Sequence, residues 1–454
     1  MEPRAPRCCT KGVRFRGGLL AVAALALVVA WPARDTARPL ALDGPKRQAK
    51  GTVALFSRDG VTRLTHVDEQ SLRPVGRPSA RLGFTGPWAF AQPGGGLVAI
   101  ATRANDRDER ERVRFVSLSK LRLLKRTVPL DGMARALLWA RLDRLVALVG
   151  GPCCSLGLDV VTIDTGARRV VSREAVAGDV VALSRAADAL VLLMTPRNEI
   201  GSARLVVVAA DGAIRSVGLD RVRAGYSWPE GATEPIGTVR QAALAVDPDG
   251  YRAFVVQPDG PAAEIGLRSL DVAYHELSAP RSVASRVAAW LTPAAEAKGL
   301  NGPLRHGQWL GDGFVAVTGT DETAAIDANH QFVGSASPAG LAIVDTRDWT
   351  IRMLDRGADA AFPTEGLLLA TGSSWSSLSQ KPTGMGLAAY GPDRSARFKL
   401  FGGASAWVGV ISGGRAYVYL NGTEIASVVH LASGEVIGKR KGPLPYPLLT
   451  DGPN

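Results

Sequence analysis

The sequence predicts an all-β protein with a single β-propeller, for which eight four-stranded blades are favoured and seven are the alternative. Three observations lead to this fold class. One short hairpin pattern recurs along the chain, a second hairpin pattern alternates with it, and the two ends of the chain each supply part of one repeat. The predicted propeller covers residues 51–454 and follows an N-terminal segment (1–30) and a linker (31–50).

The first hairpin pattern is a β-forming run that ends in Asp-Thr, a few turn residues, and a second β-forming run. Its clearest copies are "TIDTGARRVV" (162–171) and "IVDTRDWTIR" (343–352). Six weaker copies begin at Thr65, Val116, Val207, Arg268, Ala388 and Val429. This recurrence indicates a repeat architecture.

The second hairpin pattern is a short apolar strand, a tight polar or Gly turn and a strongly apolar strand. Seven copies begin at Trp88, Leu137, Val181, Ala243, Gln308, Ala361 and Trp407. Two hairpins make a four-stranded unit, which cannot bury both of its faces alone. A closed ring of such units buries every face and leaves only short edges.

The two ends of the chain complete this ring in the predicted topology. Three strands at the start, Val53–Phe56, Val61–Val67 and Leu72–Val75, have no innermost partner, and the chain ends on one candidate strand in "PLLTDG" (447–452). We therefore predict that the C-terminal strand completes the first blade and closes the ring as a clasp.

Two stretches resemble a known class of repeat. "AVDPDGYRAFVVQ" and "LDVVTIDTGARRVV" are similar to the repeats of bacterial extracytoplasmic YVTN and WD40-like β-propeller proteins, with their Pro-Asp-Gly turn and Val-Ile-Asp-Thr strand end; "IVDTRDW" also matches. The resemblance implies the fold over about residues 51–454 and implies no particular activity.

The position of a connection in the strand order of a blade determines which of the two faces of the ring it lies on. Turns from the first to the second strand and from the third to the fourth lie on one face, here called the turn face. All other connections lie on the opposite face, here called the insertion face. The long insertions belong to the insertion face: 103–112, 150–157, 223–240, 281–306, 319–338 and 372–384. Within 281–306, Val283, Val287, Trp290 and Leu291 have the spacing of an amphipathic helix packed on the rim.

Long loops on a rigid scaffold are the usual place for a binding site, so we expect ligand contacts on the insertion face. The candidate ligand-binding residues are Tyr226, Trp228, Glu230, Asp321, His330 and Trp375. Trp228, Glu230, Asp321, His330 and Trp375 are expected on the same side as Cys153 and Cys154, and the turns at Asp249-Gly250 and Asp312-Gly313 on the other. Alternatively, Tyr226 and Trp228 pack within their own Pro-rich loop.

The N-terminal segment has the order of an export signal. Basic residues end at Arg16, an apolar run spans Leu19–Trp31, and Val28 with Ala30 offers a small-residue cleavage site. A cleaved signal and an uncleaved signal anchor are both open, and either predicts an extracytoplasmic protein that is secreted or anchored in the membrane. Adjacent Cys153 and Cys154 form a vicinal disulfide or remain two small loop residues.

The composition argues against several classes of function. The net charge of +12 falls to +8 without residues 1–30, and 44 Arg against 10 Lys indicates a compositional bias rather than a basic surface for nucleic acid. No G-x-S-x-G occurs, and no His or Cys has metal-ligand spacing, so neither a metal nor a cofactor is expected.

We therefore expect a non-catalytic scaffold that binds a protein, glycan or small-molecule ligand at the cell envelope. A lactonase-like hydrolase on the same scaffold is the alternative, because some YVTN-like propellers are such enzymes. A quinone-cofactor dehydrogenase also resembles this fold, but the repeated Trp motif of that family is missing here.

Overall fold

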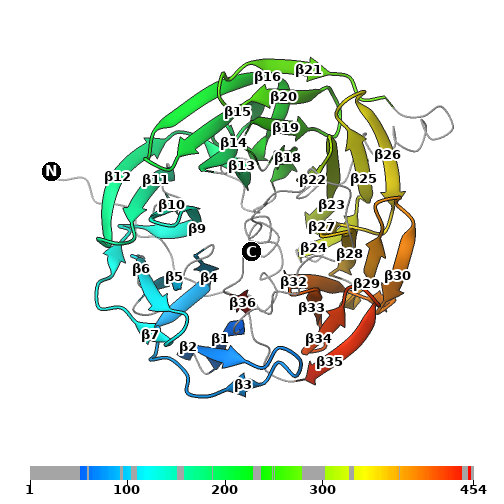
Figure 1. The fold of residues 1–454 in the computed structure, drawn as a ribbon. Coiled ribbons are helices and arrows are strands. Elements are labelled where there is room, and N and C mark those ends of the chain that lie inside the picture. Colours follow the sequence, from blue (N-terminus) through cyan, green and yellow to red (C-terminus); the bar gives the residue numbers. More distant parts are fainter. Residues whose placement is uncertain are drawn as a thin grey trace.

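The computed structural model describes most of the chain after residue 51. The described residues are 52–58, 61–92, 96–103, 110–150, 158–186, 188–228, 237–247, 249, 251–278, 302–326, 332–377, 379–441 and 448–450. Every regular element in these ranges is a β-strand, and the strands form antiparallel sheets arranged around a central axis (Figure 1). The all-β propeller prediction is thus confirmed.

The strands of the first half of the ring follow each other from the axis outward. The first blade contains β36 (Leu448–Thr450), β1 (Thr52–Arg58), β2 (Val61–Val67) and β3 (Pro74–Val75). The second contains β4 (Phe84–Ala91), β5 (Leu97–Arg103), β6 (Arg112–Ser117) and β7 (Arg122–Leu123), with β8 (Val128–Pro129) also on β6. The third contains β9 (Met133–Arg141), β10 (Arg144–Gly150), β11 (Leu158–Asp164) and β12 (Arg169–Val176). The fourth contains β13 (Asp179–Arg185), β14 (Ala189–Thr195), β15 (Ile200–Ala209) and β16 (Ile214–Ser227), plus β17 (Thr238–Arg240).

The second half repeats this order. The fifth blade contains β18 (Ala243–Val246), β19 (Arg252–Val256), β20 (Ala262–Gly266) and β21 (Val272–His275). The sixth contains β22 (Gly302–Gly311), β23 (Phe314–Ile326), β25 (Leu341–Asp345) and β26 (Thr350–Asp355), plus β24 (Phe332–Pro338). The seventh contains β27 (Ala360–Thr364), β28 (Leu367–Ser376), β29 (Ser379–Tyr390) and β30 (Ala396–Leu400), plus β31 (Gly403–Ala404). The eighth contains β32 (Ala406–Ser412), β33 (Arg415–Leu420), β34 (Ile425–His430) and β35 (Glu435–Lys441).

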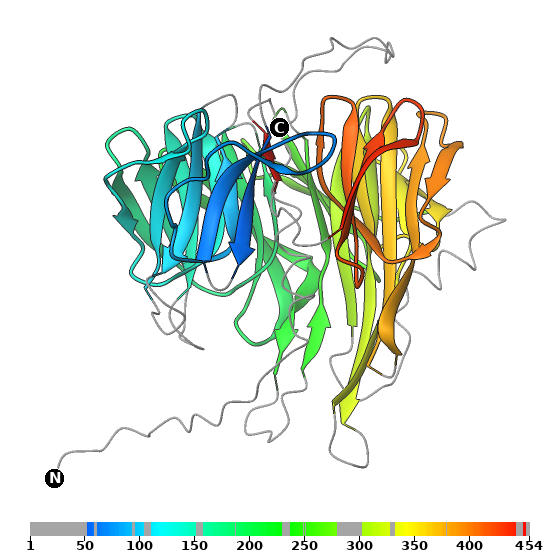
Figure 2. The same cartoon turned by 90° about the horizontal axis from the view of Figure 1, so that it is seen from below.

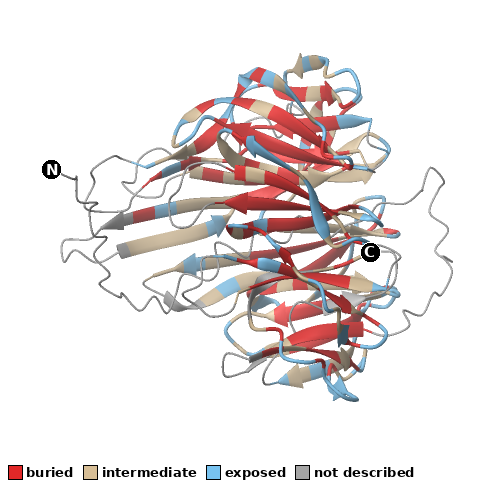
Figure 3. Cartoon of the chain, turned by 90° about the vertical axis from the view of Figure 1, so that its left-hand side faces the viewer, coloured by how far each residue is buried: buried red, intermediate tan, exposed pale blue. Residues whose placement is uncertain are grey.

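Burial follows the position of each strand in its blade. All seven residues of β14, a second strand, are buried, because the sheet has a neighbour on both faces. The outermost strand β12 is exposed over most of its length. In Figure 3 the middle of the ring is mostly buried, whereas the strand ends on one face are mostly intermediate or exposed.

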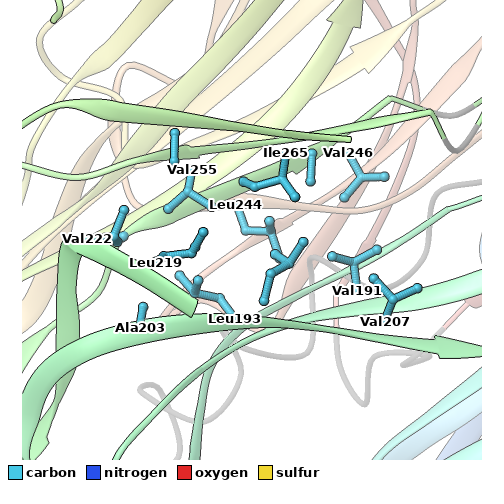
Figure 4. Close-up of a cluster of buried hydrophobic side chains, with 14 of the residues drawn as sticks. Val191, Leu193, Ala203, Val207, Leu219, Val222, Leu244, Val246, Val255 and Ile265 are labelled. Carbon is cyan, nitrogen blue, oxygen red and sulfur yellow. The ribbon is translucent and has the colours of Figure 1, made fainter. Parts of the chain in front are cut away.

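The hydrophobic core is divided into clusters between neighbouring blades. The described residues form eight such clusters, and each one joins two consecutive blades, including the eighth to the first. Figure 4 shows the cluster between the fourth and fifth blades, where Leu193 and Val207 lie across from Leu244 and Val255. This continuity of apolar contacts closes the ring, as expected for the predicted arrangement of blades.

The predicted clasp is also present. Strand β36 pairs antiparallel with β1, and Thr52 lies opposite Thr450. Polar contacts join the first and eighth blades as well: Glu69 accepts hydrogen bonds from Thr52 Oγ1 at 3.2 Å and from Arg415 Nη1 at 2.9 Å. The ring is therefore closed by backbone pairing and by a shared carboxylate.

The insertion face differs from the expectation in one respect. Residues 223–240, 319–338 and 372–384 were expected as loops, but most of their described residues extend paired strands: β16 with β17, β23 with β24, and β28 with β29. Likewise, β22 begins at Gly302, inside the expected insertion 281–306. In the edge-on view of Figure 2 the green and yellow strands of these hairpins project beyond the ring on one side.

Two of these hairpins are joined to each other. Strand β24 of the sixth blade pairs with β28 of the seventh, with Ser335 opposite Ser376 and Ala336 opposite Trp375. The two blades thereby share one ten-stranded sheet. The residues of the helix expected at 283–291 lie outside the described part of the chain.

Candidate functional site

The innermost strands carry a set of polar residues to the insertion-face end of the central channel. Each innermost strand starts at the insertion face and runs toward the turn face, because it follows a blade-to-blade connection and precedes a tight turn. Residues at the start of these strands therefore lie around one mouth of the channel. On the walls formed by the fourth to sixth blades, the mouth contains Gln241, Arg305 and His306.

Gln241 is the centre of the first polar cluster. It is 2% exposed, and its side-chain Nε2 donates to the Arg305 carbonyl at 3.1 Å and lies 3.2 Å from His306 Nδ1. Its backbone N–H also donates to the Pro303 carbonyl at 2.9 Å. Just before β18, Gln241 thus ties the fifth blade to β22 of the sixth.

A glycine lets these two strands approach closely. A Cβ at Gly307 would lie 2.7 Å from the backbone carbon of Leu244, so only glycine fits beside β18 at that point. The close contact leaves a small cavity of about 20 Å³ next to Gln241 and His306, with room for one water-sized group. A larger ligand would therefore bind over the cluster and not inside it.

The imidazole of His306 is neutral at neutral pH. Burial of the ring by surrounding protein atoms, together with the nearby Arg305 charge, lowers the pKa of His306 to about 4. Because Gln241 Nε2 is a donor, His306 Nδ1 accepts, and the ring proton is on Nε2. The ring can therefore donate one hydrogen bond toward the channel, whereas its basic nitrogen is already occupied.

Arg305 provides the positive charge of this cluster. It is 1% exposed and its Nη2 donates to Asp321 Oδ1 at 2.8 Å, while Nη1 donates to the Thr320 carbonyl at 3.0 Å. Burial lowers the pKa of Arg305, and the Asp321 carboxylate opposes that shift. The charge is therefore held in place by the second strand of its own blade.

Two further groups lie beside this cluster. The Tyr226 hydroxyl donates to Gln241 Oε1 at 3.5 Å, and burial, with the charges of Asp179 and Glu322, raises its pKa to about 12. Burial also raises the pKa of Glu322. Of the predicted site residues, Tyr226 and Asp321 thus belong to one polar cluster, here called the channel cluster: Tyr226, Gln241, Arg305, His306, Asp321 and Glu322.

A second polar cluster lies at the starts of β27 and β32. The Asp359 carboxylate accepts a hydrogen bond from the Ser373 N–H at 2.7 Å, and burial raises its pKa to about 7. Ser373 Oγ and Ser405 Oγ are 2.7 Å apart, and Asn421 Nδ2 donates to Ser405 Oγ at 2.8 Å. Hydroxyl and carboxyl groups of the seventh and eighth blades thus border the same mouth.

The two predicted tryptophans lie on the insertion face and are partly exposed. Trp228 directly follows β16 and is 42% exposed, and Trp375 in β28 is 37% exposed. Asn198 exchanges two hydrogen bonds with the Trp228 backbone, at 2.6 and 3.1 Å, and a Cβ at Gly237 would lie 2.8 Å from the indole ring. One side of Trp228 is therefore packed on its own hairpin, and the other side is open.

Some expectations lie outside the described residues, namely Glu230, His330, Cys153 and Cys154. The turn that contains Asp312-Gly313 connects a first to a second strand, and Asp249 lies between two such strands, β18 and β19, on the face opposite Trp228, Asp321 and Trp375; Gly250 lies outside the described residues. Sequence reasoning missed Gln241, Arg305, His306 and Asp359. A polar residue one or two positions before an innermost strand was the available signal for Asp359 and Gln241.

Within the described residues, no three His, Cys, Asp or Glu side chains are grouped so that they could hold a metal ion. The same part of the chain contains no helix that is long and apolar enough to span a membrane.

Solved structures similar to this chain include WD40 and propeller domains. The dihydro-heme d1 dehydrogenase NirN is 12% identical over 95% of this chain and 83% of its own, with a TM-score of 0.47. AztD from Citrobacter koseri is 10% identical over 88% and 97%, with a TM-score of 0.44. The WD40 domain of Toxoplasma gondii coronin is 11% identical over 83% and 85%, with a TM-score of 0.39.

No protein-family model matches the sequence, and no curated protein matches it. The identities to solved structures are too low to transfer an activity, a ligand or a partner to this chain.

Proposed function

We propose that this chain is an exported β-propeller, with YVTN-type repeats, that binds a ligand or partner protein through its insertion face and performs no reaction on it. The observation that carries the proposal is the set of extended hairpins on that face. Strands β23, β24, β28 and β29 continue beyond the ring, and the pairing of β24 with β28 joins them. Extra paired strands on one face give a rigid platform for recognition.

The side chains on this face suit recognition. Trp228 and Trp375 offer partly exposed indole rings, which contribute strongly to binding when a partner covers them. The channel cluster adds a neutral His306 N–H and the Arg305–Asp321 pair at the centre of the same face. Aromatic rings around a polar centre are suited to a protein, a glycan or a small ligand.

The hydrolase alternative has less support from the same residues. A general base needs a free lone pair and a pKa near the working pH. His306 Nδ1 is occupied by Gln241, and its pKa of about 4 makes the ring a weak base at neutral pH. Asp359, with a pKa near 7, is the more suitable base, but Ser373 Oγ and Ser405 Oγ hydrogen-bond to each other, and no histidine of the described residues is hydrogen-bonded to either hydroxyl.

Binding can be tested without knowing the ligand. A photocrosslinking amino acid is placed at Trp228, at Trp375, or at the control Tyr251, which is 49% exposed and follows the turn on the opposite face. We expect adducts in the native cells from the first two positions and none from Tyr251, measured by intact-protein mass spectrometry. Equal adduct formation at all three positions contradicts a binding role specific to the insertion face.

A second test separates binding from packing. In a Trp375→Ala or Trp228→Ala variant, adduct formation from a neighbouring position on the same face should fall while the melting temperature stays nearly unchanged. Equal losses of adducts and stability would mean that the rings are packing residues of the rim.

The export part of the proposal rests on residues 1–30 of the sequence. Mass spectrometry of the protein from fractionated cells should find an N-terminus near Trp31, or a full-length chain in the membrane fraction. Full-length protein in the cytosol would contradict both.

A further inference from the structure

The net charge of the chain is concentrated in one region. Residues 70–130 contain twelve Arg and Lys against four Asp and Glu, a net charge of +8. This equals the net charge of all of residues 31–454, so the rest of that range balances to zero. The Arg-rich composition is therefore not spread evenly, and the basic excess belongs to the second blade and the adjoining edge of the first.

The described cations of this region lie along the outer edges of these two blades. Residues 76–82 continue β3 along the edge of β2, where the Ser79 N–H donates to the Leu64 carbonyl at 2.8 Å. In Figure 1, β3 and β7 lie at the outside of neighbouring blades. We call this surface the basic rim; it consists of Arg73, Arg77, Arg81, Arg112, Arg114, Lys120, Arg122, Lys125 and Arg126.

Two arginines of β6 connect the two edges. Val116 of β6 packs in the core cluster with the first blade, whereas Phe115 packs toward the third. Because side chains alternate along a strand, Arg112 and Arg114 lie on the side of the first blade. Burial and the neighbouring Arg112 charge lower the pKa of Arg114. The cations of both edges therefore form one continuous surface.

No acid neutralises the basic rim within the described residues. None of its nine cations forms an ion pair there, and Arg114 Nε is buried without a hydrogen-bond partner. The one described acid of the region, Glu111, is 5% exposed and accepts from the Ala134 N–H of the third blade at 2.7 Å. The other three acids, at positions 106, 108 and 109, lie outside the described residues. A cluster of like charges without counter-charges attracts an external anion.

The other side chains of the rim indicate which kind of anion fits. The exposed aromatic rings of the described residues, Trp228, Tyr251 and Trp375, all lie elsewhere, so the rim offers no ring for bases or sugars to stack on. Val75 instead lies between Arg73 and Arg77 and is 50% exposed. An apolar side chain among cations is suited to the boundary between phospholipid headgroups and acyl chains.

We propose that the basic rim binds the headgroups of anionic phospholipids and places the first two blades against a membrane surface. The cations contact the lipid phosphates, and Val75 enters the interface. The linker 31–50 joins the ring at β1, so an uncleaved anchor at 1–30 would tether the first blade near the same surface. The rim shares no residue with the proposed binding site on the insertion face, and vesicle binding can be measured whether or not the protein is exported.

The first test measures binding of the purified full-length protein to vesicles by co-sedimentation. Vesicles of equal parts phosphatidylglycerol and phosphatidylcholine should bind it more tightly than pure phosphatidylcholine, and added salt should reduce the difference. The triple variant Arg122→Gln, Lys125→Gln, Arg126→Gln should lose about 10- to 100-fold in affinity for the anionic vesicles, because each cation near the surface adds to binding. The apolar run 19–31 is the same in every variant, so the comparison cancels its contribution.

The matched control removes the same number of cations from the sixth and seventh blades. Arg352, Arg356 and Lys399 are exposed and form no ion pair among the described residues. Their joint replacement by Gln should leave vesicle binding unchanged, and both triple variants should keep the melting temperature of the unmodified protein. Equal binding by the two triple variants, or equal binding of the unmodified protein to both kinds of vesicle, would overturn the proposal.

A second test separates a bilayer from a soluble polyanion. Val75→Ser removes an apolar contact and no charge, so it should weaken binding to anionic vesicles about 3- to 10-fold and leave binding of inorganic polyphosphate unchanged. Leu142→Ser, at a position 57% exposed in a turn of the third blade, is the control and should bind normally. If Val75→Ser binds anionic vesicles as well as the unmodified protein, and polyphosphate binding falls only in the rim triple variant, the rim is a site for a soluble polyanion and the membrane assignment is wrong.

Discussion

At the channel mouth, burial shifts the pKa values of Asp359 and His306 in opposite directions. The free energy of unfolding therefore depends on pH in opposite ways through these two residues. Burial disfavours the charged form of each side chain. It raises the pKa of Asp359 to about 7 and, together with the Arg305 charge, lowers the pKa of His306 to about 4. Both groups are therefore kept uncharged by the fold over part of the pH range. The unfolded chain ionises each group at its ordinary pKa, so the two residues contribute opposite slopes to stability.

Asp359→Asn should stabilise the protein above pH 7. The folded protein holds a proton on Asp359 between pH 3.8 and about 7, where the unfolded chain has lost it, so stability falls as pH rises through this window. Asparagine cannot ionise and still accepts from the Ser373 N–H, so the free energy of unfolding at pH 8 should rise by about 1–2 kcal/mol. Urea unfolding at pH 5 and pH 8 measures this; an equal change at both pH values contradicts it.

His306→Gln should make the protein less sensitive to acid. The unfolded chain binds a proton at His306 below pH 6.5 and the folded protein only near pH 4, so stability is lost as pH falls through that window. The variant should lose less stability than the unmodified protein between pH 7 and pH 4.5 in thermal unfolding. His430→Gln, at an exposed position, is the control and should follow the unmodified protein.

Individual residues of the site were partly predictable. Tyr226 and Asp321 were expected from the aromatic and acidic character of their insertions, and both belong to the channel cluster through their contacts with Gln241 and Arg305. Arg305 and His306 were missed because they lie in a stretch, 302–306, that was assigned to a loop. Without the strand, the alternation that points His306 to the channel and buries Arg305 could not be applied.

At the scale of elements, the hairpins of the insertion face are less apolar than the rest of the ring. Strand β24 and the outer part of β23 have mostly intermediate exposure, whereas β14 is buried throughout. Strands exposed on both faces do not need the apolar alternation that sequence reasoning detects. The first and second hairpins of each blade were therefore predictable, and the extended strands at 319–338 and 372–384 were not.

The pairing of β24 with β28 should be removable without opening the ring. Ala336→Pro removes a backbone donor and conflicts with strand geometry at the residue opposite Trp375. Hydrogen exchange should become faster in β24 and the ends of β28 and β29, while β14 and the core clusters stay protected. Faster exchange throughout the sixth and seventh blades would mean that this pairing supports the ring itself.

At the scale of the whole molecule, closure depends on the pairing of β36 with β1. A chain that ends at residue 447 lacks β36, so β1 has an unpaired edge. We expect a clearly lower melting temperature and concentration-dependent aggregation in light scattering. A chain that ends at residue 450 keeps the strand and is the control; equal stability of the two truncated proteins would show that the clasp contributes little.

Because β1 and β36 are neighbours in one sheet, the order of blades around the ring does not depend on where the chain is cut. Circular permutants that join the present ends by a short linker and open a turn on the turn face should fold to the same ring. A permutant opened instead in the insertion-face connection between β26 and β27 should behave differently. A cut there separates in sequence two blades whose hairpins share the β24–β28 ladder, which must then form across the full length of the chain. Permutants cut at that point should refold more slowly than the others, so the sixth and seventh blades behave as one module of the ring.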